Sequence, residues 1–132
     1  MNFSIKGDLE SSMLRGFSDA ELESRWTDST RSTISCVSQQ KFKVARITVS
    51  PFVVAGHARQ RVTFSVNGAA GVTRELTAAN EKSVIELPLP SQTPGQPMVF
   101  TLDLPDAVSP TSLGVGNDGR RLGIAVRSLP FE

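Results

Sequence analysis

Polar and apolar residues alternate in short runs along this chain, and glycine, proline, asparagine or aspartate separates one run from the next. This period-two pattern is typical of β-strands, in which successive side chains point to opposite faces. It is clearest in residues 60–66, where Val62, Phe64 and Val66 would share one face. The same pattern predicts strands at residues 3–5, 31–37, 42–49, 72–76, 83–90, 98–104 and 122–129.

Many short strands without a long helical period predict an all-β fold. About eight to ten strands at this spacing suit two packed antiparallel sheets, so we expect a β-sandwich of jelly-roll type, similar to a carbohydrate-binding module. The length of 132 residues suits one domain, residues 1–132, and no internal repeat or linker divides it. Only residues 19–23 are expected to form a short helical turn. Asn67 and Gly68 predict a tight hairpin turn, because both residues readily take positive φ angles.

The charge balance argues against several partners. Lysine and arginine number 14 against 13 acidic residues, which leaves a net charge of +1. A nucleic-acid surface needs a clustered basic excess, so we expect no nucleic-acid partner. We expect no membrane insertion either, because no apolar run is long enough to span a bilayer. The N-terminal residues MNFSIKGDLESS lack the apolar core of a secretory signal. A stand-alone chain would therefore be cytoplasmic, and a membrane-anchored parent would make it periplasmic or extracytoplasmic.

Cysteine and histidine each occur once, as Cys36 and His57. A single cysteine excludes an internal disulfide, and one cysteine with one histidine cannot supply the roughly four ligands of a structural zinc site. We expect no metal and no cofactor. Cys36 lies in an alternating run and is expected to be a small buried hydrophobic residue. His57 is expected in a loop, so a nucleophilic Cys36–His57 pair is disfavoured.

The segment RGFSDAELESRWT, residues 15–27, contains the only tryptophan, Trp26. A tryptophan can stack on the face of a sugar ring while nearby charged side chains bind its hydroxyl groups. This hypothesis places Arg25 and Glu21 beside Trp26 in a ligand site. In the structural alternative, Trp26 fills the core at one end of the sandwich, and Arg25 pairs with Glu21 or Glu23. Both interpretations remain open.

Glu21 and Glu23 also suggest a small glycoside hydrolase, which needs two carboxyl groups about 5–9.5 Å apart. Two glutamates separated by one residue in a strand would meet that distance. No other feature of the sequence supports hydrolysis, and this hypothesis ranks last.

A second charged segment lies near the C-terminus. Asn117, Asp118 and Gly119 predict a tight hairpin turn, and Arg120 and Arg121 follow it directly. Two guanidinium groups can clamp an anion. The favoured alternative is structural: Asp118 caps the turn, and one arginine pairs with Asp118 or with Glu21. Asp118 and Arg121 would then lock the last strand against the N-terminal segment. A calcium site at Asn117 and Asp118 is weakly supported, because calcium needs six or more oxygen ligands.

Several of these segments together resemble a known bacterial family. The segments are RGFSDAE with RWT near the N-terminus, QRV with VNG at residues 60–68, and SP, LG and DGRRLGI within residues 109–124. In this order they resemble a β-sandwich domain of unknown function. That domain is found at the soluble C-terminal end of membrane-bound phosphoglycerol transferases, which act on periplasmic glucans, and of some glycosyltransferases. The resemblance covers residues 3–131, and Glu21, Trp26, Asp118 and Arg121 match its pattern.

The resemblance implies a non-catalytic accessory module associated with polysaccharide biosynthesis, with no catalytic residues. The first hypothesis is a module that contacts a glycan or polyol through Trp26 and Arg25, with support from Glu21 and Arg121. The alternative is a structural or protein-interaction module that packs on a partner catalytic domain or self-associates through a sheet edge. In both, Asn67, Gly68, Asp118 and Arg120 serve the fold.

Overall fold

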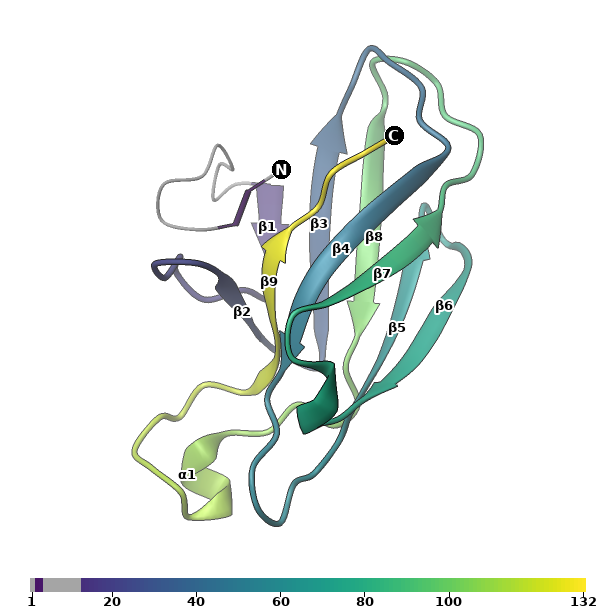
Figure 1. Ribbon diagram of the computed structural model, residues 1–132. Coiled ribbons are helices and arrows are strands. Elements are labelled where there is room, and N and C mark those ends of the chain that lie inside the picture. The colour runs from purple at the N-terminus through teal and green to yellow at the C-terminus, as the bar shows by residue number, and fades with distance from the viewer. Residues whose placement is uncertain (1, 4–12) are drawn as a thin grey trace.

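The computed structural model describes residues 2–3 and 13–132, and the strands of these residues form two antiparallel sheets (Figure 1). The five-stranded sheet contains, in spatial order, β1 (Leu14–Arg15), β3 (Arg31–Val37), β8 (Pro97–Asp103), β5 (Gln60–Val66) and β6 (Ala69–Leu76). The four-stranded sheet contains β2 (Arg25–Asp28), β9 (Leu122–Ser128), β4 (Val44–Pro51) and β7 (Ser83–Pro88). The expected two-sheet β-sandwich is confirmed.

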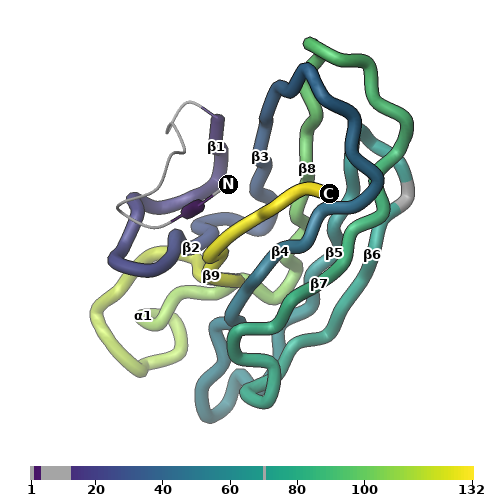
Figure 2. Tube along the Cα trace, turned by 45° about the horizontal axis from the view of Figure 1, so that its top comes forward, coloured from purple at the N-terminus to yellow at the C-terminus, as the bar shows by residue number. Residues whose placement is uncertain are grey.

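The connectivity nests one strand pair inside the next. β5 pairs with β6, β4 with β7, β3 with β8 and β2 with β9, so partners move progressively apart in sequence. Consecutive strands therefore often cross from one sheet to the other, and Figure 2 shows the two layers that result. This arrangement brings strands from both ends of the chain together in the four-stranded sheet.

The alternating residues of the predicted strands meet between the sheets. Val62, Phe64 and Val66 of β5 are all buried, as their spacing predicts. Burying a side chain of this size contributes about 1.5–3 kcal/mol. Cys36 is also buried at 8% exposure, which confirms the expectation that it behaves as a small core residue. The largest fully buried side chains are Phe3, Phe64, Phe100, Ile34, Ile47, Leu87, Leu102, Leu104, Ile124 and Leu129.

The hairpin between β5 and β6 turns at Asn67 and Gly68, as predicted. Their φ angles are 51° and 75°, and a two-residue turn of this kind needs positive φ at both central positions. Asn67 also joins the hairpin to β8. Its backbone N–H donates to the Val99 carbonyl, and its side-chain oxygen accepts from the Val99 N–H, both at 2.8 Å.

Two short helices lie wholly within the described ranges, and neither is where the sequence suggested one. A 3-10 helix, η2 (Ala78–Asn80), precedes β7, and α1 (Pro110–Leu113) lies at the lower end of the sandwich in Figure 1. The helical turn expected at residues 19–23 is absent, because this segment forms bends in which Glu21 N–H donates to the Ser24 carbonyl at 2.8 Å. Within the described ranges, no helix is both long enough and apolar enough to cross a membrane.

The prediction of a tight hairpin turn at residues 117–119 is also wrong. This segment belongs to a longer connection from α1 to β9. Thr111 fixes it on α1, since the backbone N–H and the hydroxyl of Thr111 both donate to the Asp118 carbonyl, at 3.0 and 2.8 Å. Of the strand expected at residues 3–5, only Phe3 lies in the described ranges, and its N–H donates to the Arg127 carbonyl.

Candidate functional site

Trp26 lies on the outer face of the four-stranded sheet. Burial alternates along β2, with Arg25 and Thr27 buried and Trp26 and Asp28 half-buried. Arg25 is opposite Val126, a core residue with no exposure, so the Arg25 side of β2 faces inward and the Trp26 side faces outward. The structure therefore contradicts the alternative in which Trp26 fills the core. The side chains of Arg25 and Trp26 therefore lie on opposite faces of the sheet.

A row of small side chains begins beside Trp26. Trp26 is paired in register with Ala125 on β9, and Ala125 is paired with Ser50 on β4. The small Ala125 and Ser50 side chains leave space over the middle of the sheet, and the large indole borders it. The result is a hollow of about 360 Å³. Its lining residues are Ser24, Trp26, Ser50, Pro51, Val53, Ala78, Glu81, Ala125 and Arg127, and it is called the Trp26 hollow below.

The indole has a neighbour that orients it. The Phe52 ring meets the Trp26 ring edge to face, with centroids 6.2 Å apart and an interplanar angle of 86°. Such perpendicular contacts are favourable for aromatic pairs. Phe52 follows the end of β4 and is held by its N–H, which donates to the Gly123 carbonyl at 2.8 Å. The Trp26 ring is therefore positioned both by β2 and by the segment that follows β4.

Arg127 supplies the guanidinium of the Trp26 hollow, and the sequence argument missed it. Its Nη1 donates to Glu23 Oε2 at 3.0 Å, and its Nε donates to the Ser50 hydroxyl at 3.4 Å. Arg127 stands two residues after Ala125 in β9 and therefore shares its face. The alternation of the predicted strand at residues 122–129 already placed Arg127 on the same face as Ala125. It did not show that this strand, β9, pairs with β2 and so brings Arg127 near Trp26.

Three of the four residues predicted to bind a ligand lie outside the lining of the Trp26 hollow. Arg25 is buried on the opposite face, where Nη1 donates to the Ser18 carbonyl at 3.4 Å and Nε has no hydrogen-bond partner among the described residues. Arg25 thus does not make the expected pair with Glu21 or Glu23. Arg121 is exposed, and its backbone N–H donates to Asp28 Oδ1 at 2.8 Å.

Glu21 belongs to a separate cluster with Asp118 and Arg120. Arg120 Nη2 donates to Asp118 Oδ2 at 2.7 Å, and Arg120 Nη1 reaches Glu21 Oε2 at 3.4 Å. The backbone N–H of Arg120 also donates to Asp118 Oδ1 at 2.9 Å. These side-chain and backbone hydrogen bonds from Arg120 lower the pKa of Asp118. One arginine was expected to pair with Asp118 or with Glu21, and Arg120 contacts both. The expected lock named Arg121, but the arginine that joins Asp118 to the N-terminal segment is Arg120.

Glu21 and Glu23 do not lie in a strand, which corrects the geometry assumed for a hydrolytic pair. They stand on the bend before β2 and border a shallow hollow of about 250 Å³ together with Leu22, Ser24 and Arg127. Each carboxylate contacts a different arginine, Arg120 for Glu21 and Arg127 for Glu23. These ion pairs suit a role in attaching the bend to β9 and its preceding loop.

Neither metal nor thiol chemistry has a built site in the described ranges. No group of three or more histidine, cysteine, aspartate or glutamate side chains there is arranged to hold a metal ion. The Cys36 thiol lies 3.7 Å from the Met98 carbonyl oxygen, and burial raises its pKa. His57 lies in the loop before β5, as expected, with its Nε2 2.9 Å from Gln60 Nε2. Cys36 and His57 are thus engaged by different elements.

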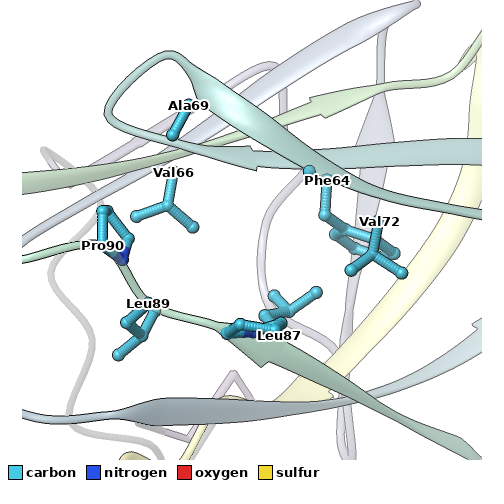
Figure 3. Close-up of a pocket in the computed structure, with 9 residues that line it drawn as sticks. Phe64, Val66, Ala69, Val72, Leu87, Leu89 and Pro90 are labelled. Atoms are coloured by element: carbon cyan, nitrogen blue, oxygen red, sulfur yellow. The ribbon is translucent and has the colours of Figure 1, made fainter.

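An apolar groove opens at another edge of the sandwich, between the β5–β6 hairpin and the end of β7. Figure 3 shows Phe64, Val66 and Val72 on one side, facing Leu87, Leu89 and Pro90 on the other. Its volume is about 330 Å³. The strand pattern assigned Phe64 and Val66 to the core but did not indicate that the sheets leave a groove here. We call it the β6–β7 groove.

We compared the chain with protein-family models, curated proteins and solved structures, and none of the three comparisons found a match.

Proposed function

We propose that this chain is a non-catalytic module of jelly-roll type that binds a sugar or polyol in the Trp26 hollow. The observation that carries the proposal is the outward, half-buried Trp26 beside Ser24, Ser50 and Arg127. A flat apolar ring with a few polar groups at its edge is the combination that binds hydroxylated rings. The volume of about 360 Å³ also falls in the usual range of ligand sites.

The strand connectivity supports the jelly-roll part of this proposal. The nested pairs, from β5–β6 out to β2–β9, are what a long hairpin produces when it rolls into two sheets. Lectin domains are among the proteins built on jelly rolls. The motif resemblance described above adds the biological setting, an accessory role beside an enzyme of glycan modification.

The ligand contacts in this proposal differ from those first expected. Trp26 keeps its role as the stacking surface, whereas Arg127 takes the place of Arg25 as the guanidinium beside it. Glu21 and Arg121 are assigned to the fold instead. The hydroxyl groups of Ser24 and Ser50 provide further polar contacts without adding charge.

The composition makes the experiment direct. The chain has one tryptophan and no tyrosine, so its intrinsic fluorescence reports on Trp26. Linear and cyclic glucans should change this emission in a saturable way, and calorimetry should give the same affinity. The Trp26→Ala variant should not bind the sugar. Its affinity must be measured by calorimetry, because the substitution removes the fluorophore. Arg127→Ala should weaken binding, whereas Arg121→Ala should leave it unchanged.

The result that would overturn the proposal is the absence of any saturable response at millimolar sugar. Unchanged calorimetric affinity in Trp26→Ala would do the same, provided that circular dichroism shows a native fold.

A second candidate function is a module that packs on a partner domain or on itself. The β6–β7 groove favours it, since its apolar lining at the edge of the sandwich offers a place where a side chain of a partner could pack. Light scattering separates the two functions. A defined oligomer whose melting temperature does not respond to sugar supports the interaction module, and a monomer stabilised by sugar supports the binding module.

A further inference from the structure

The charges around the Trp26 hollow bear on which sugars it accepts. Among the described residues that line it, the cation is Arg127, and an anion of the protein already engages it. Arg127 Nη1 is 3.0 Å from Glu23 Oε2, and the Arg127 side chain is only 21% exposed. An incoming carboxylate or phosphate would have to compete with Glu23 for this guanidinium. The hollow therefore has no uncompensated positive charge among its lining residues.

The lining of the hollow also includes an anion, Glu81. This residue follows η2, and its side chain is exposed. Glu81 forms no ion pair with any described residue. Lys82 is next in the chain but does not line the hollow. Counting Arg127 with its partner Glu23 as neutral, the hollow is left with one net negative charge.

Hydrogen bonds fix the backbone on both sides of Glu81, so its Cα keeps its place beside the hollow. On the preceding side, Thr77 caps η2, and its backbone N–H donates to Asn80 Oδ1 at 2.8 Å. On the following side, the Lys82 N–H donates to the Ser50 hydroxyl at 3.2 Å. Ser50 also lines the hollow, so the segment that carries Glu81 is attached to its floor.

From this distribution we infer that the hollow prefers an amino sugar to a neutral or an acidic one. The inference rests on the proposed function and names the ligand class of that site. An ammonium group gains a Coulomb attraction to Glu81, whereas a uronate or a phosphorylated sugar is repelled. The same ammonium group is also attracted to the electron-rich face of an indole. A glycan containing glucosamine is the class of ligand that combines both contacts with a hydroxylated ring.

The test compares three tetrasaccharides that differ in charge, with Trp26 fluorescence as the readout. They are a glucosamine tetramer, a neutral glucose tetramer and a galacturonate tetramer. We expect the glucosamine tetramer to bind about two- to fivefold more tightly than the neutral one, the range for a solvent-exposed charge pair. The galacturonate tetramer should bind most weakly. The preference for glucosamine should shrink at high salt, because mobile ions screen an exposed pair.

A matched pair of variants assigns the preference to one residue. Glu81→Gln should bring the ratio of the glucosamine-tetramer affinity to the neutral-tetramer affinity down to about one, and this ratio is the readout because Glu81 lines the hollow and can contact either sugar. Glu75→Gln, which alters an exposed glutamate on β6 that pairs with Arg59, should change neither affinity. Circular dichroism of both variants checks that the fold is retained.

The outcomes separate the two proposals. If no tetramer binds, the proposed function fails and this inference fails with it. If the neutral tetramer binds as tightly as the glucosamine tetramer, or if Glu81→Gln leaves the preference intact, only the amino-sugar inference is overturned.

Discussion

Asp118 and Arg120 form a bidentate pair on the loop before β9, with Nη2–Oδ2 and Nε–Oδ1 distances of 2.7 and 3.0 Å. Arg120 also reaches Glu21 at 3.4 Å, so the same guanidinium connects the bend before β2 to the loop before β9. β2 and β9 are neighbours in the four-stranded sheet, and this cluster stands beside their junction. It joins these two segments together with the Glu23–Arg127 ion pair and the hydrogen bond from the Arg121 N–H to Asp28.

The first prediction concerns this cluster. Arg120→Ala should lower the free energy of unfolding by about 1 kcal/mol, because the arginine side chain is one-third exposed and solvent screens its pairs. Arg121→Ala should change it by less than about 0.5 kcal/mol, the usual range for an exposed position. Urea denaturation of both variants measures the difference. A larger loss in Arg121→Ala than in Arg120→Ala would contradict the assignment.

A second prediction follows from Asp106, which accepts from Arg61 through Nε at 2.9 Å and Nη2 at 2.8 Å. These bonds hold the pKa of Asp106 at about 2, below the ordinary 3.8. A lowered folded-state pKa stabilises the fold above the unfolded pKa, and this stability is lost as pH falls through about 2.

Because Arg61 is more than half exposed, we expect Asp106 to contribute only about 1 kcal/mol at neutral pH. Urea denaturation between neutral pH and pH 2 should therefore show a smaller loss of stability for Asp106→Asn than for the parent chain. If the free energy of unfolding depends on pH equally in the parent chain and in Asp106→Asn, the Asp106–Arg61 pair does not stabilise the fold through the lowered pKa of Asp106.

Gly71 provides a third prediction, because β5 approaches it closely. A Cβ atom at this position would lie 1.3 Å from the Phe64 carbonyl oxygen, so the backbone must shift to admit any side chain. We expect Gly71→Ala to cost about 1–3 kcal/mol, the range for overpacking. Gly119→Ala is the control, since a Cβ there would meet nothing within 4 Å. Thermal melts of the two variants should differ clearly, with Gly119→Ala close to the parent.

The fourth prediction uses the small floor of the Trp26 hollow. Ala125→Leu should extend an apolar side chain into the space over β9 and block stacking on Trp26. We expect at least a tenfold loss of sugar affinity in calorimetry. Because Ala125 is only 3% exposed, the larger side chain should also lower the free energy of unfolding, by about 1–3 kcal/mol. Thr63→Leu on the outer face of the five-stranded sheet serves as the control. If sugar affinity survives in Ala125→Leu, the ligand site lies elsewhere.

Much of the fold follows from local patterns in the sequence. The run at residues 31–37 forms β3 and the run at residues 60–66 forms β5, because alternation of side chains is a property of single strands. Asn67 and Gly68 produced the expected turn for the same reason, since their positive φ angles are a local preference. At Asn117–Gly119 the same local signal failed, because Thr111 holds the segment on α1 through contacts that no turn rule contains.

The candidate site depends on relationships that the alternation does not encode. The sequence alone placed Arg127 in a strand but predicted none around Trp26, and pairing between β2, β9 and β4 brought the two residues to one hollow over Ala125 and Ser50. The sequence argument chose Arg25 because it is adjacent to Trp26 in the chain, but Arg25 lies on the opposite face and Arg127 lines the hollow instead. Alternation arises within one strand, whereas the order of strands in a sheet arises from contacts between distant segments. The tertiary structure therefore decided which side chains meet.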